Sequence, residues 1–541
     1  MVLVPVPRRA PVARRAPVAR RAPVASRAPV ARRALLGLCV ALALVAAGGV
    51  AGCGSDSARG HGAGAAGPAA LVTVQAHASA RRVPFGFLGL SLEYQAIEPY
   101  AGGDPSALDP VFEQLVRNLV PGQASVLRIG GDSADRTWRP TAGLTRPAGV
   151  SFAITDRWLA VTRGLTASLH ARLIVGLNLE ADSPSLAAAE AGALTSGLGR
   201  GTVRALELGN EPDLYASFPW YRTSAGGVTG RPPNYGMSAL IDDFTRFAAV
   251  LPAGLVAGPS LGAPAWTEQL GRFLAAEPRV RLVTLHRYPL QLCFIPRGSP
   301  RYPTVNHLLA PAASIGLADS FGRYAGIARA HGLALRIDEL NSVSCGADPA
   351  VSQSFASALW VLNTLFEMVR VGIHGVNVHT FPGAGYDLFH IRRAGGRWSA
   401  AVSPEYYGLM LFARAAPAGS RLLRVTGAAN GRLRTWATAD GAGAIRVLVV
   451  NTGPRAREVS VRLAGAPAGS ATVERLTAPG PRARSGATLA GQSFGPRTFT
   501  GSLPGAPHVS AVPPLGGRYV VTVPGESAAL LVISPPAAGV A

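Results

Sequence analysis

Apolar runs separated by turn residues recur through the middle of the chain. Eight of these runs predict buried strands, at residues 87–94, 125–131, 172–179, 204–211, 255–261, 281–289, 333–341 and 375–381. Helical patterns, such as residues 238–251, lie between most of them. In residues 354–371, apolar side chains recur at spacings of three and four, as on one buried helix face: Phe355, Leu359, Leu362, Phe366 and Val369. Apolar strands that alternate with helices indicate a parallel sheet, and eight such units predict an α/β fold, a (β/α)8 TIM barrel.

The pattern changes after residue 415, where short alternating strands, glycines and prolines continue to the C-terminus. This texture is typical of an all-β domain. We therefore expect the barrel at residues 71–411 and a C-terminal β-sandwich domain at residues 412–541. The apolar stretch 69–76 precedes the barrel and is available as an additional strand of the β domain.

Polar residues gather at the carboxyl ends of the predicted strands, where a barrel of this type places its active site. A core strand does not need such residues, and burying them without partners costs free energy. Six of the strands contribute them: Glu93, Arg128, Asp132, Asn210, Glu211, His286, Tyr288, Glu339, Asn341 and His379. Packing alone does not account for six such endings, so we expect an active site at this rim.

Glu211 and Glu339 follow the fourth and seventh strands and are expected to face each other across the barrel. Two carboxyls about 5–5.5 Å apart fit a retaining glycosidase, and a wider gap fits an inverting one. One carboxyl must be protonated and the other ionised, so their environments must differ. Other interpretations stay open at this point. Glu211 can occupy the first turn of a helix, Glu339 can pair with Arg336, and Tyr288 and Tyr386 can be packing aromatics.

Several other kinds of site are not indicated. We interpret His286 and His379 as hydrogen-bonded residues of the rim, because the chain lacks a His/Asp spacing typical of metal ligands. We find neither a glycine-rich phosphate loop nor a GxSxG nucleophile elbow, so we expect no metal and no cofactor. No dense stripe of arginine and aromatic residues suggests nucleic-acid binding. The formal net charge of +22 includes nine arginines in residues 1–52, and the remaining chain carries +13. That charge fits acidic partners, such as uronic-acid polymers or anionic lipid, or an arginine-rich solvated surface.

The motifs also carry a resemblance. LELGNEPD (206–213) resembles the acid/base segment of clan A glycoside hydrolases, and LRIDELNSVSCG (335–346) resembles their nucleophile segment. Four segments in order are more specific: LRIGGDSADRTW (127–138), HRYPLQLC (286–293), ELNSVSCG (339–346) and PEYYGLMLF (404–412). Together they resemble bacterial members of glycoside hydrolase family 79, which includes β-glucuronidases and heparanase-like enzymes. The resemblance runs from about residue 70 to the C-terminus.

The resemblance implies Glu211 as the acid/base and Glu339 as the nucleophile, with retention of configuration. It implies Asn210 as the partner of the sugar 2-hydroxyl, and Arg128 and Tyr288 as the groups that keep Glu339 ionised. It places the remaining substrate contacts at Glu93, Asp132, Ser344, Gly346 and Tyr386, the last three at the uronate carboxylate. Two departures leave the sugar open: Ser344 stands where some members have a tyrosine, and Arg287 where a second histidine is common.

The first 52 residues predict a secretory signal. RRAPVA repeats over residues 8–33 cannot form a core, and a short apolar run follows at residues 34–52. The run ends in VAGC, which resembles a bacterial lipobox and predicts lipidation of Cys53. A plain signal peptide or a membrane helix with a chance cysteine is the alternative. Residues 53–70 predict a flexible tether. We expect an exported protein that is anchored to the cell membrane by its lipid and faces the outside.

Cys293 and Cys345 remain after the signal and the lipid site are set aside. In an oxidising compartment two leftover cysteines can pair, and these two follow strands that are neighbours in a barrel. We expect a disulfide, with two free buried thiols as the alternative.

The sequence thus predicts an exported retaining glycoside hydrolase that acts on β-linked glucuronic acid. Two alternatives stay open. One is a clan A hydrolase of another sugar, endo-acting or xylosidase-like. The other is a catalytically silent surface protein that binds carbohydrate.

Overall fold

The computed structural model describes residues 70–199, 201–427 and 431–535, all of which belong to one compact unit. The predicted signal, most of the tether and Cys53 lie outside these residues. Within the described ranges, no helix combines the length and apolar character needed to cross a membrane.

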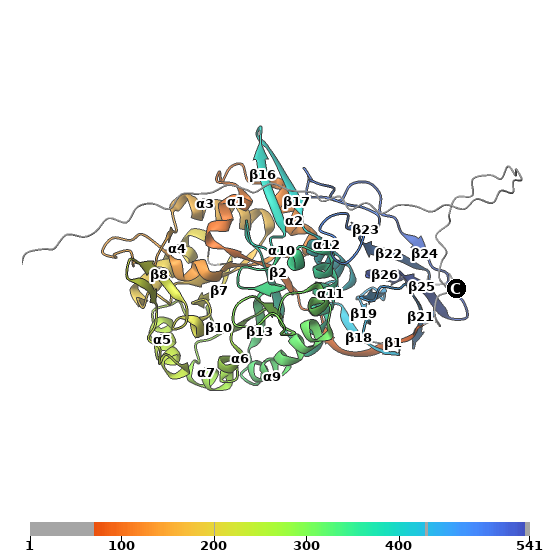
Figure 1. Ribbon diagram of the computed structural model, residues 1–541, viewed down its shortest axis with the longest axis horizontal. Helices are drawn as coiled ribbons and strands as arrows, with labels where there is room; N and C mark the ends of the chain where they lie inside the picture. Colours follow the sequence, from red (N-terminus) through yellow and green to blue (C-terminus); the bar gives the residue numbers. More distant parts are fainter. Residues whose placement is uncertain (1–69, 200, 428–430, 536–541) are drawn as a thin grey trace, which may run out of the picture. The chain divides into compact units, whose positions relative to one another are not determined.

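Eight parallel strands close into a barrel, as predicted (Figure 1). Each strand pairs with the next, and the last, β15, pairs with the first, β2. In order around the barrel the strands are β2 (Leu88–Glu93), β3 (Val126–Gly130), β6 (Arg172–Leu177), β7 (Val203–Leu208), β10 (Val256–Leu261), β11 (Leu282–Arg287), β13 (Ala334–Leu340) and β15 (Gly375–His379). The prediction of an α/β barrel is confirmed.

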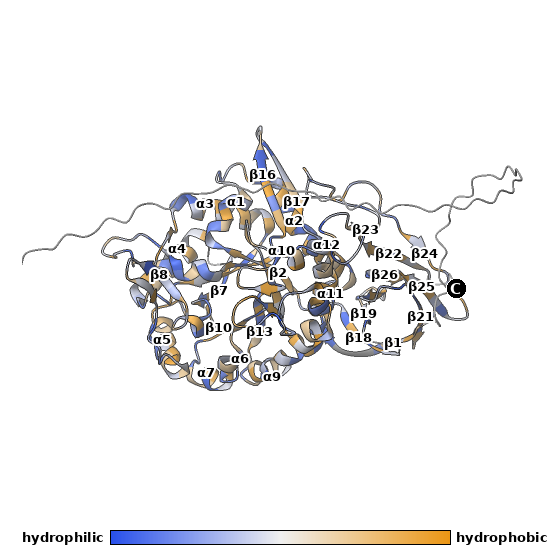
Figure 2. Cartoon of the chain, in the orientation of Figure 1, coloured by the Kyte–Doolittle hydropathy of each residue, from blue (hydrophilic) through white to orange (hydrophobic). Residues whose placement is uncertain are grey.

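The helices between the strands carry local start signals. Asp109, Thr155 and Ser183 each accept a backbone N–H in the first turn of the following helix, which satisfies a donor that the helix itself leaves free. The longer helices of the described residues are α2 (Pro110–Leu119), α3 (Asp156–Leu169), α4 (Pro184–Leu198), α5 (Met237–Ala249), α7 (Leu270–Ala276), α9 (Leu317–Ala330), α11 (Phe355–Val371) and α12 (Pro404–Ala415). The short ones are α1 (Ile97–Ala101), α6 (Pro264–Thr267), α8 (Val305–Leu308) and α10 (Pro349–Ser352). In Figure 2 the outer helices α3, α4 and α5 carry both hydrophilic and hydrophobic residues.

Helix α11 differs from the expectation of one buried face, because every residue from Phe355 to Val369 is buried. It packs against α9 and α12 and also contacts strand β20 (Ile445–Asn451) of the C-terminal domain. A helix that is covered on all sides can carry apolar residues on every face. The spacing of three and four in α11 therefore identified one packed face and missed the others.

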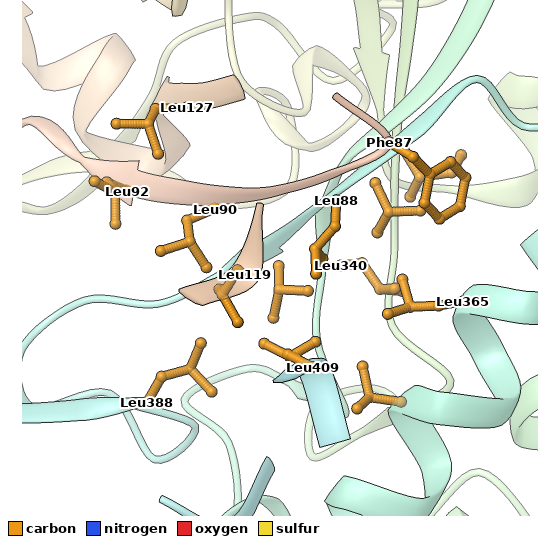
Figure 3. Packing of buried hydrophobic residues seen from close by; sticks show 14 of the residues in the cluster. Phe87, Leu88, Leu90, Leu92, Leu119, Leu127, Leu340, Leu365, Leu388 and Leu409 are labelled. Carbon is orange, nitrogen blue, oxygen red and sulfur yellow. The ribbon is translucent and has the colours of Figure 1, made fainter. Parts of the chain in front are cut away.

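Side chains of the barrel strands alternate between two environments, as a strand's period of two requires. On β2, Leu88, Leu90 and Leu92 lie among apolar side chains that include Leu365, Leu388 and Leu409 (Figure 3). The intervening residues of the strand face the barrel interior. The lower interior is apolar and consists of Val126, Ile174, Ala205, Ala257 and Leu282, with Ala334 packed against them.

Above this layer the interior becomes polar. Arg336 is buried and donates to Asn377 and to the backbone oxygens of Gly86 and Phe87. A Cβ on Gly375 would lie 1.9 Å from Arg336 Nη1, so glycine is required there to make room for the guanidinium. Arg336 therefore does not pair with Glu339, contrary to one of the open interpretations.

The C-terminal domain is all-β, as predicted. Its main path runs in the order β23 (Thr488–Leu489), β22 (Ala471–Thr477), β26 (Ser527–Ile533), β20, β19 (Leu433–Ala439), β18 (Arg421–Gly427), β1 (Ala70–Arg82), β21 (Arg457–Ala464) and β25 (Arg518–Val523). β24 (Ser510–Ala511) pairs with β22. The N-terminal strand β1 lies between β18 and β21. Val72 of β1, Val447 of β20 and Tyr519 of β25 share one apolar cluster, so the sheet curves to enclose its own core.

Candidate active site

Glu211 lies just beyond strand β7 in a left-handed backbone conformation, with φ 50° and ψ 57°. Its N–H donates to the carbonyl of Ser260 at the end of β10, and its carboxyl lies against Gly262, where a Cβ would approach Oε1 to 2.6 Å. Gly209, at φ 75°, turns the chain out of the strand. The chain after β7 thus turns so that the carboxyl of Glu211 points toward the rim rather than into the core.

Glu339 lies near the end of strand β13 and is surrounded by donors. Arg128 Nη1 donates to its Oε2 at 2.6 Å and Tyr288 Oη donates to its Oε1 at 2.8 Å. Burial alone would raise the pKa of this carboxyl, but the charges of His379, His286 and Arg128 and the hydrogen bond from Tyr288 hold it well below its usual range. Glu339 is therefore an ionised carboxylate at neutral pH.

Glu211 and Glu339 face each other. A carboxylate oxygen of Glu211, one of Glu339 and a ring nitrogen of His286 all lie within 4.8 Å of one another. His286 Nδ1 is 3.4 Å from Glu211 Oε1 and 4.0 Å from Glu339 Oε2. The side chain of Glu211 is 20% exposed and that of Glu339 is 9% exposed. One carboxyl is thus open to solvent and the other is enclosed by donors.

Arg128 connects the two ends of the site. Its guanidinium donates to Glu207, Ser91, Glu339 and Asn210 at 2.7, 3.1, 2.6 and 2.9 Å. Asn210 therefore presents its carbonyl oxygen to Arg128, and its amide nitrogen donates to Asp132 at 3.2 Å. The guanidinium fixes the side-chain orientation of Asn210, next to Glu211, and of Glu339 at the same time.

Sequence reasoning did not identify Glu207 and Asp338, which lie buried beneath Glu339. Arg128 Nε is 2.7 Å from Glu207 and 3.7 Å from Asp338. Burial would raise the pKa of Glu207, but the charge of Arg128 lowers it, whereas burial and the charge of Glu207 raise the pKa of Asp338 well above its usual range. Arg128 thus favours the ionised form of Glu207, and burial beside Glu207 favours the neutral form of Asp338. Both residues lie on strands and face inward, so the period of two was the signal that could have found them.

Asp135, also missed, organises the loops above β7. It accepts hydrogen bonds from the backbone N–H groups of Leu179, Glu180 and Asn210 and from Tyr215 Oη. It lies in the short helix η2 (Gly131–Arg136). Four donors on one buried carboxylate tie together the chain segments after three strands, and no local sequence pattern reports this convergence.

Glu93 and His379 line the side of the site formed by β2 and β15. His379 Nε2 is 3.5 Å from Glu93 and Nδ1 is 4.0 Å from Glu339, while Nδ1 also contacts Ser91 Oγ at 2.9 Å. Burial would lower the pKa of His379, but Glu339 and Glu93 raise it. Asp132 lies at the mouth of the site. Its pKa rises to about 7 because desolvation and the negative charges of Glu93, Glu339 and Glu211 disfavour its ionised form.

The predicted uronate contacts do not all occupy the same position. Tyr386 is buried, and its ring centroid is 6.0 Å from that of Tyr288 and 5.8 Å from that of His379. Ser344 lies on the short strand β14 (Val343–Ser344), and Gly346 is exposed at φ 89°. Tyr386 therefore lines the site beside the nucleophile, and the other two lie on the loop that leaves β13.

Cys293 and Cys345 form a disulfide with a Cα–Cα distance of 5.9 Å. Beside it, β12 (Leu290–Gln291) pairs with β14. The disulfide and this ladder join the loop after β11 to the loop after the nucleophile strand.

Two groups of carboxylate and imidazole side chains are compact enough for a metal ion: Glu207, His286 and Asp338, and Glu211, His286 and Glu339. In both groups Arg128 already lies at hydrogen-bond distance from a carboxylate, at 2.7 Å from Glu207 and 2.6 Å from Glu339. A guanidinium in that position already compensates the carboxylate charge and repels a further cation, so these donors do not fit a metal ion.

Comparison with known proteins gives one family match and a consistent set of structures. Residues 435–530 match the model of the glycosyl hydrolase family 79 C-terminal beta domain. No curated protein sequence matches the chain. A 4-O-α-L-rhamnosyl-β-D-glucuronidase from Fusarium oxysporum, solved as a Rha-GlcA complex, has a TM-score of 0.65 at 18% identity, covering 85% of this chain and 100% of that one.

Two arabinofuranosidases have the same fold. A GH51 arabinofuranosidase from Xanthomonas axonopodis pv. citri has a TM-score of 0.61 at 17% identity, over 86% of this chain and 100% of that one. The α-L-arabinofuranosidase of Thermotoga maritima has a TM-score of 0.58 at 14% identity, over 86% and 99%. The resemblance seen in the sequence is thus confirmed: the chain has the fold of these glycosidases, and residues 435–530 match the C-terminal beta domain of glycosyl hydrolase family 79.

Proposed function

We propose that the protein is a retaining glycoside hydrolase that cleaves β-linked glucuronic acid, with Glu339 as nucleophile and Glu211 as acid/base. The observation that carries the proposal is the approach of these two carboxylates to within 4.8 Å. That approach supports the short separation of retaining enzymes, about 5–5.5 Å, over the wider separation of inverting enzymes, about 6.5–9.5 Å.

The reaction proceeds in two displacements. Glu339 attacks the anomeric carbon while the bond to the leaving oxygen breaks, and that oxygen takes a proton from Glu211. A covalent glycosyl–enzyme ester results. Glu211 then removes a proton from water, the water oxygen attacks the same carbon, and the ester bond breaks to release Glu339. Two inversions give net retention.

The surrounding donors support these roles. Arg128 and Tyr288 hold the two oxygens of Glu339 in place, which orients one lone pair for attack. Asn210 is oriented by Arg128 and Asp132, and we assign it to the sugar 2-hydroxyl. A hydrogen bond at that hydroxyl strengthens as the transition state gains oxocarbenium character. Glu93 is placed to accept from a hydroxyl on the opposite side.

The uronate assignment has two supports. The C-terminal domain matches family 79, and the first of the similar structures is a glucuronidase crystallised with a glucuronic-acid disaccharide. Tyr386 lies beside the nucleophile, where it can donate its hydroxyl to the sugar carboxylate. Ser344 and Gly346 are assigned to the same group, from the loop that follows β13.

A neutral sugar is the second candidate, and it rests on the acidic lining of the site. Desolvation and the negative charges of Glu93, Glu339 and Glu211 bring the pKa of Asp132 to about 7. A uronate carboxylate brought close to these groups would be repelled. The arabinofuranosidases among the similar structures fit this alternative.

The test combines hydrolysis with trapping. The purified protein is assayed with the 4-nitrophenyl β-glucuronide, β-xyloside, β-glucoside and α-L-arabinofuranoside, beside Glu339→Ala. Glucuronide turnover that is lost in Glu339→Ala and restored by azide supports both sugar and nucleophile. Turnover of another glycoside overturns the uronate assignment and keeps the mechanism. Absence of turnover in all four overturns the proposal in favour of an endo-acting or silent protein.

Export and anchoring form a separate part of the proposal. We infer that the chain is cleaved before Cys53 and lipidated at that residue. Metabolic labelling with a tagged palmitate, followed by fractionation, tests this inference. Label that is present in the wild type and lost in Cys53→Ala, with release from the membrane, is expected. An unlabelled wild type refutes it.

A further inference from the structure

We propose that Phe218 and Phe294 form a binding surface for a flat, apolar leaving group, so that the substrate is an aryl-type glycoside. This inference rests on the proposed function and adds the chemical class of the aglycone. Its basis is a pair of exposed aromatic rings on the two loops that flank the acid/base residue.

The two rings are unusually exposed for phenylalanine. Phe294 is 72% exposed and Phe218 is 37% exposed, and Leu292 beside them is 36% exposed. The ring centroids of Phe218 and Phe294 are 5.4 Å apart at an interplanar angle of 77°. Together they present the face of one ring beside the edge of the other. Contiguous apolar side chains in water are typical of a binding surface.

The rings belong to the rim at which the carboxylates lie. Phe218 follows strand β7 and precedes the hairpin strand β8 (Pro219–Thr223), while Phe294 follows β11. Only β10 separates β7 from β11 in the barrel. Glu211 occupies this interval, because its N–H bonds to Ser260 of β10 and its carboxyl approaches His286 of β11. The two loops therefore flank the carboxyl that protonates the leaving oxygen.

Phe294 is held in its exposed position. Its φ of 64° is a left-handed conformation that costs free energy for a bulky residue. The preceding residue, Cys293, is joined to Cys345 by the disulfide, and β12 pairs with β14 just before it. A strained backbone that is fixed by a covalent bond indicates that the ring is kept at the surface rather than folded into the core.

The chemistry of the surface selects the occupant. Phe218, Leu292 and Phe294 offer no hydrogen-bonding groups from their side chains, whereas a second sugar unit requires partners for its hydroxyls. One phenylalanine presents its face and the other its edge. A flat aromatic ligand can stack on the first ring and contact the edge of the second. The aglycone is therefore assigned as aromatic rather than as a sugar.

The experiment compares two substrates that carry the same sugar. 4-Methylumbelliferyl β-glucuronide has a bicyclic aglycone, and β-glucuronyl fluoride leaves a single atom. Phe294→Ala and Phe218→Ala are each expected to lower kcat/KM roughly three- to tenfold for the first substrate and to leave the second unchanged. Phe85→Ala is the matched control, because Phe85 is also 72% exposed but lies before β2, at the opposite end of the barrel.

Each outcome decides the inference. Equal losses on both substrates, or no loss on the umbelliferyl glycoside, overturn it. An equal loss on a glucuronyl disaccharide overturns the aromatic assignment in favour of a sugar subsite. Failure of the wild type to hydrolyse the fluoride refutes the glucuronide assignment of the proposed function and leaves the aglycone assignment to be decided on the sugar that is turned over. If another sugar proves to be the substrate, the same pair of leaving groups is used on that sugar.

Discussion

Replacing Arg128 with methionine removes a fully buried guanidinium that donates to Glu207, Glu339, Asn210 and Ser91. Methionine retains much of the volume, so the loss is mainly electrostatic. Breaking a buried ion pair from one side costs about 3–5 kcal/mol, because the remaining charge is buried without a partner. The entropy of unfolding is about 2 cal/mol/K per residue, so a loss of 1 kcal/mol of stability lowers the Tm of a unit of this size by about 1 °C. The Tm of the variant is therefore expected to fall by about 3–5 °C.

The destabilisation should depend on pH. In the wild type the pKa values of Glu207 and Glu339 are lowered, so they stabilise the fold above their unfolded pKa of about 4.3, and this stability is lost as the pH falls. Without the guanidinium, Glu207 loses the first of the charges that lower its pKa, and burial then disfavours its ionised form. Glu339 loses one of several lowering contributions and keeps those of His379, His286 and Tyr288. Through Glu207 the variant therefore loses stability as the pH rises. The difference between wild type and variant should therefore be larger at pH 8 than at pH 5.

The assay is thermal unfolding of both proteins at pH 5 and pH 8, with Arg163→Met as the control. Arg163 is an exposed arginine on helix α3, where a substitution should change stability by less than about 0.5 kcal/mol. A difference in Tm below 1 °C at pH 8, or an equal difference at both pH values, would refute the account of Arg128 as the cation that holds this buried network.

Three further outcomes are expected. Tyr288→Phe removes the hydrogen bond to Glu339 at 2.8 Å; the acidic limb of the pH profile of kcat/KM should move to higher pH, and an unchanged limb would contradict the role of this hydroxyl. Replacing Cys293 and Cys345 together by serine opens a loop of 52 residues; the free energy of unfolding should fall by at most about 4 kcal/mol, measured by denaturant titration against the oxidised parent, and a rise would contradict the assignment. Gly375→Ala places a methyl group 1.9 Å from a buried guanidinium. The soluble yield should fall sharply beside Gly192→Ala on helix α4, where no atom lies within 4 Å of the added Cβ, and equal yields would contradict the packing described around Arg336.

The alternation of apolar strand segments with helical segments, and the change to short strands after residue 415, were enough to predict the architecture. Barrel strands are buried, so they appear in the sequence as nearly continuous apolar runs. The helices between them instead show apolar residues at spacings of three and four. The same reasoning located the polar strand ends, because a carboxylate such as Glu211 at the end of a buried strand has no role in packing. Glu211 and Glu339 were thus recognisable as a pair before their distance was known.

The buried acids that support the site, Glu207, Asp338 and Asp135, were not recognisable in the same way. Glu207 and Asp338 look like isolated acids within two apolar strands, and only the closed barrel brings both to Arg128. Asp135 looks like one acid in a polar loop, yet it collects donors from segments that are about 45 to 80 residues away. Contacts of this kind depend on long-range closure of the chain, which residue patterns over short windows do not contain.

The sequence by itself determined the sequence of strands and helices, the all-β C-terminal domain and the two candidate carboxylates, because each depends on local periodicity or on a residue type at a strand end. The tertiary structure alone decided that Glu207 and Asp338 meet Arg128, that α11 is covered on every side, that β1 lies between β18 and β21, and that Phe218 meets Phe294 at the rim. These features arise where segments far apart in the chain converge, and the free energy of each depends on the distance and burial that convergence creates.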